Sequence, residues 1–413
     1  MFGPMQGFQR DRETLTCDGV SLDTIARAVG TPVHIYSAAA IDARYRALDA
    51  AFAHYPHRVH YALKANSTLA IAARLRALGA GADANSGGEL DVARRAGFAP
   101  ADIVMTGVGK TRAELTQAVA LGVAAINIES AGEVDRLAAL AAAAGRRARV
   151  AVRVNPDIDA GSHPHISTGL RRTKFGVPPP VALDIARAAA RQPALAVAGL
   201  HVHVGSQVTT AAPLARAAAL LADLAGTLAR EGIAIDHLDL GGGLGVPYEP
   251  GQTTLTVEEY AAAILPAVRA SGLRLILEPG RWILAPAGVL VAEITDLKPG
   301  FVVVDAGMTD LLRPAMYAAW HGIEAVTERP GPRIHADVVG PVCETSDTLG
   351  RDRSLPPVDV GDLVAIRDTG AYGSVMASNY NRRPIAAEVL VENGTWRVIR
   401  RRQTIDDMLQ WDM

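Results

Sequence analysis

Short apolar runs alternate with longer segments of helical periodicity over most of the chain. Eight runs of four to eight residues are mainly apolar: 60–64, 82–85, 103–106, 125–128, 149–154, 197–204, 237–240 and 275–278. Between most of them, apolar residues recur with helical spacing, as in 69–78, 88–95, 133–144 and 180–191. Alternating strands and helices predict parallel pairing through right-handed crossovers. Eight such units over about 250 residues favour a (β/α)8 TIM barrel, with an open doubly wound sheet as the alternative.

The pattern changes after residue 284. Helical periodicity becomes rare, and short apolar runs are separated by Gly, Pro and Asp (289–295, 301–305, 333–339, 363–366 and 387–391). This texture is typical of an all-β domain. We therefore predict a barrel domain over residues 37–284 and a C-terminal β domain over 285–413, with residues 1–36 as a separate N-terminal segment.

Composition narrows the class of protein. A chain of 413 residues is too long for one ordinary hydrophobic core, so we expect one large domain and a smaller one. Hydrophobic residues make up 49% of the chain and charged residues 20%, proportions that are typical of a globular protein. A net charge of -2 does not indicate a nucleic-acid or membrane partner. We find no secretory signal and no apolar run that we judge long enough to span a bilayer. Two cysteines, Cys17 and Cys343, form no disulfide framework or zinc-type spacing, which predicts a cytoplasmic protein without a bound metal.

Lys64 is the first candidate for chemistry, because it ends the first apolar run. In a barrel of this kind, functional residues lie at the C-terminal ends of the strands. Desolvation lowers the pKa of a lysine, and the neutral amine can form a Schiff base with a carbonyl. The alternative is a solvated surface lysine.

Three further features follow later runs. Gly241, Gly242 and Gly243 expose backbone N–H groups that suit a phosphate, and Arg281 could add charged hydrogen bonds; a simple tight turn is the alternative. Glu278 ends the eighth run and needs a partner if buried, either a protonated ring nitrogen or a nearby arginine. His201 and His203 share one face of a strand, where an imidazole could stack on an aromatic ligand. Together, the lysine, the phosphate nest and the carboxylate describe the contacts of pyridoxal 5'-phosphate (PLP).

The sequence resembles the diaminopimelate decarboxylases, within the alanine-racemase-like (fold type III) group of PLP enzymes. Matching motifs occur in the same order over most of the chain, at 61–66, 81–90, 153–156, 163–170, 174–176, 201–207, 239–245, 278–281, 313–317, 340–344, 370–373 and 376–381. Departures are small: His165 replaces an expected tyrosine, Ala306 a common glycine, and Thr345 the usual serine. The resemblance implies a barrel with a C-terminal β domain, joined by the N-terminal segment, and a head-to-tail homodimer.

The resemblance also implies roles at the matching positions. Lys64 would hold PLP, His203 would stack on its ring, and Glu278 would pair with the pyridine nitrogen. The phosphate would be surrounded by residues from several loops: Ser206, Gly241, Gly242, Gly243, Gly280, Arg281 and Tyr372.

Substrate roles follow in the same way. Arg313 and Tyr317 resemble the residues that bind the distal carboxylate of the substrate in this family. Glu344 resembles the acceptor for the distal ammonium, and Cys343 resembles the proton donor at Cα. Arg281 and Tyr372 would also touch substrate. Cys343 and Glu344 would reach the partner's barrel.

The implied activity is PLP-dependent decarboxylation of meso-2,6-diaminopimelate to L-lysine, the last step of lysine biosynthesis. A guanidinium fits a distal carboxylate with two hydrogen bonds, whereas ornithine has no such carboxylate. The open alternatives are a related decarboxylase for ornithine, arginine or another carboxylated or carrier-bound amino acid, a racemase, and a non-catalytic PLP-binding regulator. The Cys343-Glu344 pair argues against the racemase, and Lys64, Glu278 and Cys343 together argue against the regulator.

Overall fold

The computed structural model describes residues 5–159, 161, 169 and 173–413. The chain divides into two compact units. We call Tyr45–Gly245 with Thr253–Trp282 the barrel unit, and the rest, Met1–Arg44, Val246–Gln252 and Ile283–Met413, the β unit. Of the 163–170 motif, including His165, only residue 169 lies within the described residues.

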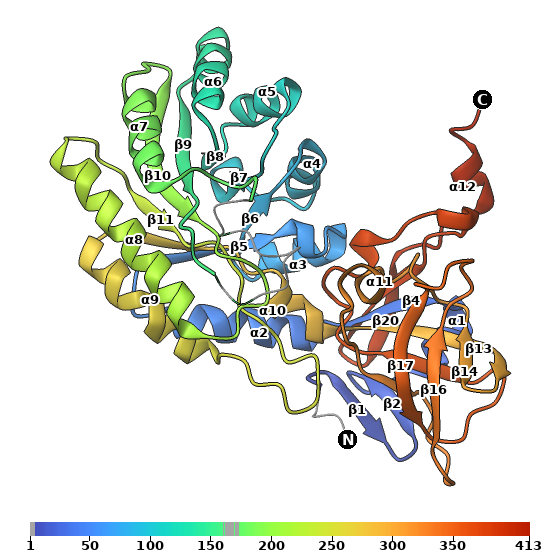
Figure 1. The fold of residues 1–413 in the computed structure, drawn as a ribbon. Coiled ribbons are helices and arrows are strands. Elements are labelled where there is room, and N and C mark those ends of the chain that lie inside the picture. The colour runs from blue at the N-terminus through green and yellow to red at the C-terminus, as the bar shows by residue number, and fades with distance from the viewer. Residues whose placement is uncertain (1–4, 160, 162–168, 170–172) are drawn as a thin grey trace. The chain divides into compact units, whose positions relative to one another are not determined.

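The barrel unit is built around a closed ring of parallel strands (Figure 1). Its eight strands are β5 (His57–Ala62), β6 (Gly81–Ala84), β7 (Ile103–Met105), β8 (Ala125–Ile128), β9 (Ala148–Val154), β10 (Leu195–Val202), β11 (His237–Asp239) and β12 (Arg274–Leu277). β12 pairs with β5 in parallel, which closes the ring. The prediction of a TIM barrel is confirmed, and the open sheet is excluded.

Helices surround these strands, and four of them have a side-chain cap at the N-terminus. The helices are α3 (Leu69–Ala77), α4 (Gly87–Arg95), α5 (Arg112–Leu121), α6 (Ala131–Ala143), α7 (Pro179–Ala190), α8 (Ala211–Arg230) and α9 (Val257–Ser271). Ser86 and Ser130 accept backbone hydrogen bonds at the starts of α4 and α6, and Thr111 and Thr256 form capping boxes with Glu114 and Glu259. Each cap supplies a partner for a backbone N–H group that the first turn of the helix leaves unpaired.

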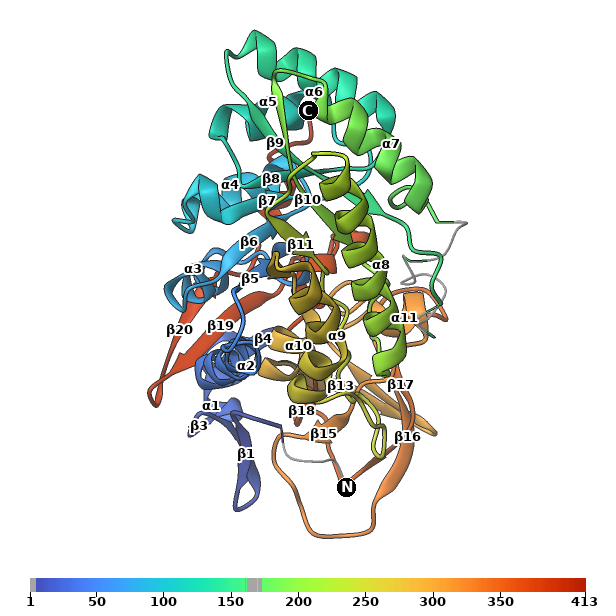
Figure 2. The ribbon, with the colours of Figure 1, turned by 90° about the vertical axis from the view of Figure 1, so that its left-hand side faces the viewer.

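Helix α8 corrects one prediction. By length and composition alone it is long and apolar enough to cross a membrane, so the statement that no segment is long enough was wrong. Its leucines Leu214, Leu221, Leu224 and Leu228 are buried, and it lies beside α9 in both views (Figures 1 and 2). A mostly alanine and leucine sequence with one buried face is also what a core helix requires.

The β unit contains a sheet of nine strands. They are β4 (Val33–Ser37), β13 (Gly288–Lys298), β14 (Phe301–Val304), β15 (Ile323–Ala325), β16 (Ile334–Val339), β17 (Thr348–Leu355), β18 (Leu363–Ile366), β19 (Ala387–Glu392) and β20 (Thr395–Arg400). β4 comes from the N-terminal segment, yet it lies between β13 and β19. This confirms that the N-terminal segment completes the C-terminal β domain.

Both faces of this sheet are covered by apolar side chains. Along β13, Val289 and Val291 belong to one core cluster, while Leu290 and Ala292 belong to another, as strand alternation requires. The first cluster also takes in a small N-terminal sheet and helix: β1 (Phe8–Asp11), β2 (Thr14–Cys17), β3 (Val20–Ser21) and α1 (Leu22–Val29).

The remaining helices are short or connect these parts: α2 (Ala38–Ala51), α10 (Arg281–Leu284), α11 (Arg313–Tyr317) and α12 (Ile405–Leu409). Five predicted apolar runs in the β domain correspond to β13, β14, β16, β18 and β19, whereas β15, β17 and β20 were not predicted. β15 has only 3 residues, too few to show a period, and β17 and β20 carry polar or charged residues at many positions, which masks the alternation that marks a strand.

Candidate active site

Lys64 lies at the C-terminal end of the barrel strands, in the short 3-10 turn Leu63–Ala65 that follows β5. Its Nζ atom lies 3.0 Å from Oδ2 of Asp83, the penultimate residue of β6. Asp83 is fully buried, while the lysine side chain is 35% exposed. The pair therefore holds the amine at the mouth of the barrel, within reach of a ligand.

Glu278 follows β12 and is only 4% exposed. One carboxylate oxygen lies 3.2 Å from Nε2 of His201, and the other accepts a hydrogen bond of 3.4 Å from Thr106 Oγ1. Burial would raise the pKa of Glu278, but His201, Lys64 and a hydrogen bond from Asp239 outweigh burial and hold that pKa well below its usual range. Glu278 is therefore a buried anion.

The pKa of Asp239, at the end of β11, is shifted in the opposite direction to that of Glu278. Burial and the charge of Glu278 raise its pKa well above the usual range, although Gly241 N donates to its Oδ1 at 2.9 Å. Two neighbouring buried carboxyl groups cannot both ionise without strong repulsion, so one proton stays on Asp239 and bridges to Glu278. Ligand atoms of His201, Asp239 and Glu278 lie within 4.8 Å of one another, a spacing that would also suit a metal ion.

His203 follows β10, close to Lys64 and Glu278. Desolvation, and then the positive charges of Lys64 and Arg153, lower its pKa well below the usual range, so the ring is neutral. Gly242 N donates to its Nδ1 at 3.2 Å, which places the ring proton on Nε2. A neutral, oriented imidazole is suited to packing flat against an aromatic ligand.

The three glycines form a cradle that other residues could not. A Cβ atom at Gly242 would lie 2.2 Å from the carbonyl oxygen of Glu278, and one at Gly243 would lie 2.4 Å from that of Gly205. Gly241 and Gly243 also have φ values of +63° and +104°. Beside the cradle, Arg281 donates to Ser206 Oγ from Nε (3.1 Å) and Nη2 (2.8 Å). At Gly280, a Cβ would lie 2.8 Å from that of Ala65.

These residues fit PLP. The amine of Lys64 suits its aldehyde, the buried anion Glu278 suits its ring nitrogen, and the neutral imidazole of His203 suits its ring face. The glycine cradle with Ser206 and Arg281 suits its phosphate. The structure brings together every predicted cofactor residue of the barrel unit. Tyr372 belongs to the β unit, as do all the predicted substrate residues except Arg281: Arg313, Tyr317 and Glu344.

Within the β unit, Arg313 is 6% exposed and tightly held. One of its nitrogens lies 2.6 Å from Nε2 of His321, whose Nδ1 lies 2.7 Å from the carbonyl oxygen of Arg367. Nδ1 therefore carries the proton, and Nε2 accepts from Arg313. The guanidinium also lies 4.3 Å above the ring of Tyr248, which fixes its plane.

The other predicted residues of the β unit differ in exposure. Cys343 is exposed, and its backbone N and Sγ both lie 3.4 Å from Asn381 Oδ1. Glu344 accepts from Tyr380 OH at 2.7 Å and from Ser346 Oγ at 3.1 Å. Tyr317 ends α11, and Tyr372 has a φ of 56°, so its backbone is held in the left-handed region.

Sequence reasoning did not assign roles to Asp83, Thr106 or Asp239, and it left His201 undecided. Asp83 is the penultimate residue of β6 and Asp239 the last residue of β11, both in segments already noted for other reasons. An acid within the last two positions of a buried strand was the available signal, because such a carboxylate needs a partner.

A parallel barrel with this amine, anion and glycine cradle defines a PLP-dependent enzyme. The pyridoxal-binding domain model of the pyridoxal-dependent decarboxylases matches residues 38–285. Diaminopimelate decarboxylase from Pseudomonas aeruginosa is 46% identical over 403 residues, covering 97% of this chain and 96% of that protein. The Neisseria meningitidis serogroup A protein of that name is 44% identical, covering 96% and 98%.

Solved structures agree. Diaminopimelate decarboxylase from Helicobacter pylori, complexed with L-lysine, has a TM-score of 0.91 at 40% identity, covering 94% of this chain and 98% of that one. Lysine decarboxylase from Selenomonas ruminantium has a TM-score of 0.81 at 26% identity, covering 90% and 96%. The chain belongs to the diaminopimelate decarboxylase family.

Proposed function

We propose that this protein is a PLP-dependent decarboxylase that converts meso-2,6-diaminopimelate to L-lysine and CO2. The observation that carries this proposal is the presence of Lys64, Glu278 and the glycine cradle at one end of one barrel. The high identity to diaminopimelate decarboxylases over nearly the whole chain supports the choice of substrate.

When bound, PLP supplies an electron-withdrawing ring that accepts the electron pair left by a departing carboxylate. Lys64 would hold the aldehyde of PLP, and Asp83 would position its amine there. Glu278 keeps a proton on the ring nitrogen, and burial strengthens that electrostatic effect. His203 orients the ring, while the cradle, Ser206, Arg281 and Tyr372 hold the phosphate.

The β unit supplies the proposed substrate grip. Arg313 and Tyr317 bind the distal carboxylate, and Glu344 accepts from the distal ammonium. The clamp of His321 and Tyr248 on Arg313 supports this role, because a guanidinium fixed in advance loses little freedom on binding. Cys343 returns a proton to Cα.

Replacing Arg313 by alanine should lower kcat/KM for meso-diaminopimelate about a hundredfold, because two charged hydrogen bonds to the distal carboxylate are lost. Arg313→Lys should recover only part of this loss, because it keeps the charge without the planar fork. Arg329→Ala, an exposed arginine of the same unit, is the matched control. Steady-state CO2 release measures all three, and an unchanged kcat/KM in Arg313→Ala would refute the grip.

Replacing Cys343 by alanine should lower kcat about a hundredfold, as expected when a proton donor is lost. PLP absorbance and circular dichroism should stay unchanged, since the side chain is exposed. Loss of folding would identify a structural cysteine instead, and unimpaired turnover would assign the proton transfer to another group.

A substrate panel tests the proposal as a whole. We expect CO2 release from meso-diaminopimelate and none of comparable efficiency from the LL and DD isomers, ornithine, arginine or lysine. Efficient turnover of lysine would instead favour the activity of the Selenomonas relative, which shares the fold.

We further propose a cytoplasmic homodimer in which Cys343 and Glu344 act at the partner's barrel. Supporting this, Cys343 is exposed, and so are the contacts of Glu344 with Tyr380 and Ser346. We also propose residues 37–284 as the PLP-binding domain and 285–413, with 1–36, as the β domain; the match of the pyridoxal-binding model to 38–285 supports the first.

A further inference from the structure

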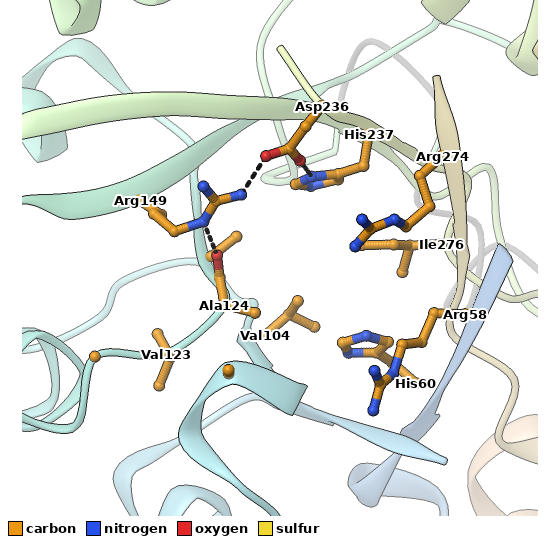
Figure 3. A pocket seen from close by; sticks show the side chains of 13 residues that line it. Arg58, His60, Val104, Val123, Ala124, Arg149, Asp236, His237, Arg274 and Ile276 are labelled. Atoms are coloured by element: carbon orange, nitrogen blue, oxygen red, sulfur yellow. Dashed lines mark hydrogen bonds and ion pairs between the residues drawn. The ribbon is translucent and has the colours of Figure 1, made fainter. Parts of the chain in front are cut away.

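The end of the barrel opposite the active site carries a concentration of positive charge. A cavity of about 230 Å3 lies there, lined by Arg58 in β5, Arg149 in β9 and Arg274 in β12, all within two residues of the start of their strands (Figure 3). His60 and His237 also line it. None of these residues takes part in the proposed chemistry, which uses the other ends of the strands.

The carboxylates nearby do not balance these arginines. Arg58 pairs with Asp102 at 2.7 Å, and Arg149 pairs with Asp236. Asp236 is shared, because its other oxygen lies 2.6 Å from Nδ1 of His237. Arg274 has no ion pair or side-chain hydrogen bond with any residue that the structure describes.

The charged groups face one another across the cavity. Figure 3 shows the guanidinium groups of Arg149 and Arg274 extending from opposite sides toward the space between them. Apolar side chains, those of Val104, Ala125 and Ile276, complete the lining. Apolar walls reduce screening, so an anion between the two guanidinium groups interacts with them more strongly than on an open surface.

The positive charge continues beyond this cavity. A neighbouring cavity of about 180 Å3 shares Gly122, Val123 and Arg149 with it and is also lined by Arg146 and Arg147. His60, in the first cavity, is buried, and burial, together with the charges of Arg58 and His237, lowers its pKa to about 4. Its neutral ring can contribute a hydrogen bond without adding charge.

We propose that the cavity binds a small tetrahedral oxyanion of the phosphate class between Arg149 and Arg274. Its volume is below that of sites for drug-sized ligands, and guanidinium groups match phosphate oxygens with paired hydrogen bonds. β9 and β12 are not neighbours in the ring, so the bound ion would link two separate parts of the barrel. An ion that binds only the folded state raises its stability.

Equilibrium dialysis of the PLP-loaded full chain against radiolabelled inorganic phosphate, at constant ionic strength, tests this proposal. Because the cofactor is loaded beforehand, its phosphate group already occupies the glycine cradle of the active site. We expect one saturable phosphate per chain beyond the cofactor, and a melting temperature that rises with phosphate concentration.

Three variants locate the site. Arg274→Gln should weaken phosphate binding about fivefold or more, and Asp236→Asn should tighten it, because it removes a competing anion from the cavity. Arg216→Gln, an exposed arginine in α8, is the matched control and should bind as the wild type does. Arg274 is exposed, so its replacement should leave folding intact, which circular dichroism checks.

The absence of saturable binding, or equal affinity in the wild type and Arg274→Gln, would overturn the proposal. Competition adds a second criterion. Sulfate should displace phosphate at similar concentrations; displacement by succinate or chloride just as readily would show general charge attraction and would also overturn it.

Discussion

Replacing Lys64 by alanine is expected to abolish both turnover and the long-wavelength absorbance of bound PLP. No other amine is placed beside Asp83 at the C-terminal ends of the strands among the described residues, so the cofactor loses its covalent attachment. We expect kcat to fall at least about a thousandfold. Absorbance spectroscopy and CO2 release measure the two effects separately.

Lys64→Arg is the control for this experiment. It keeps a positive charge opposite Asp83 but cannot form the covalent linkage, so it should be as inactive as the alanine variant while folding as the wild type does. If either variant kept substantial turnover with the absorbance band intact, another residue would have to hold the cofactor.

Replacing Glu278 by glutamine is expected to lower kcat about a hundredfold to a thousandfold, because a buried anion opposite the ring nitrogen is lost. The neighbouring Asp239 provides a contrast that follows from its raised pKa. Because the Asp239 side chain is already neutral, the Asp239→Asn side chain is neutral too, and its amide can still donate a hydrogen bond to Glu278. We expect less than about a fivefold change in that variant.

The two variants also differ in a measurement that does not depend on turnover. The pH dependence of the PLP absorbance should shift in Glu278→Gln and stay close to the wild type in Asp239→Asn. Equal losses of activity in both variants would show that the proton is not held on Asp239.

Much of this site could be predicted from local patterns in the sequence. Lys64, the glycine triplet and Glu278 each follow an apolar run, and parallel strands bring such positions to one end of a barrel. Asp83 and Asp239 were harder to assign, since their roles depend on which side chain lies opposite, across strands distant in sequence. The same limit applies to His321 and Tyr248, which fix Arg313 from separate loops.

The fold shows a similar division. Hydrophobic periodicity predicted the barrel because each βα unit is a local pattern. It could not place β4 in the middle of the sheet, because nothing near residue 33 indicates pairing with residues more than 250 positions away. Strands β17 and β20 were not predicted because their polar positions hide the alternation, and β15 because it is only 3 residues long.

The position of β4 bears on how the protein is made. Residues 33–37 are synthesised more than 300 positions before their partners in β19. The barrel strands, which end at residue 277, are complete well before then. During translation, one edge of β4 can pair once β13 is made, but the other stays unpaired, and open to mispairing, until β19 is made. A deletion that removes β19 would leave that edge of β4 permanently unpaired, although its pairing with β13 remains.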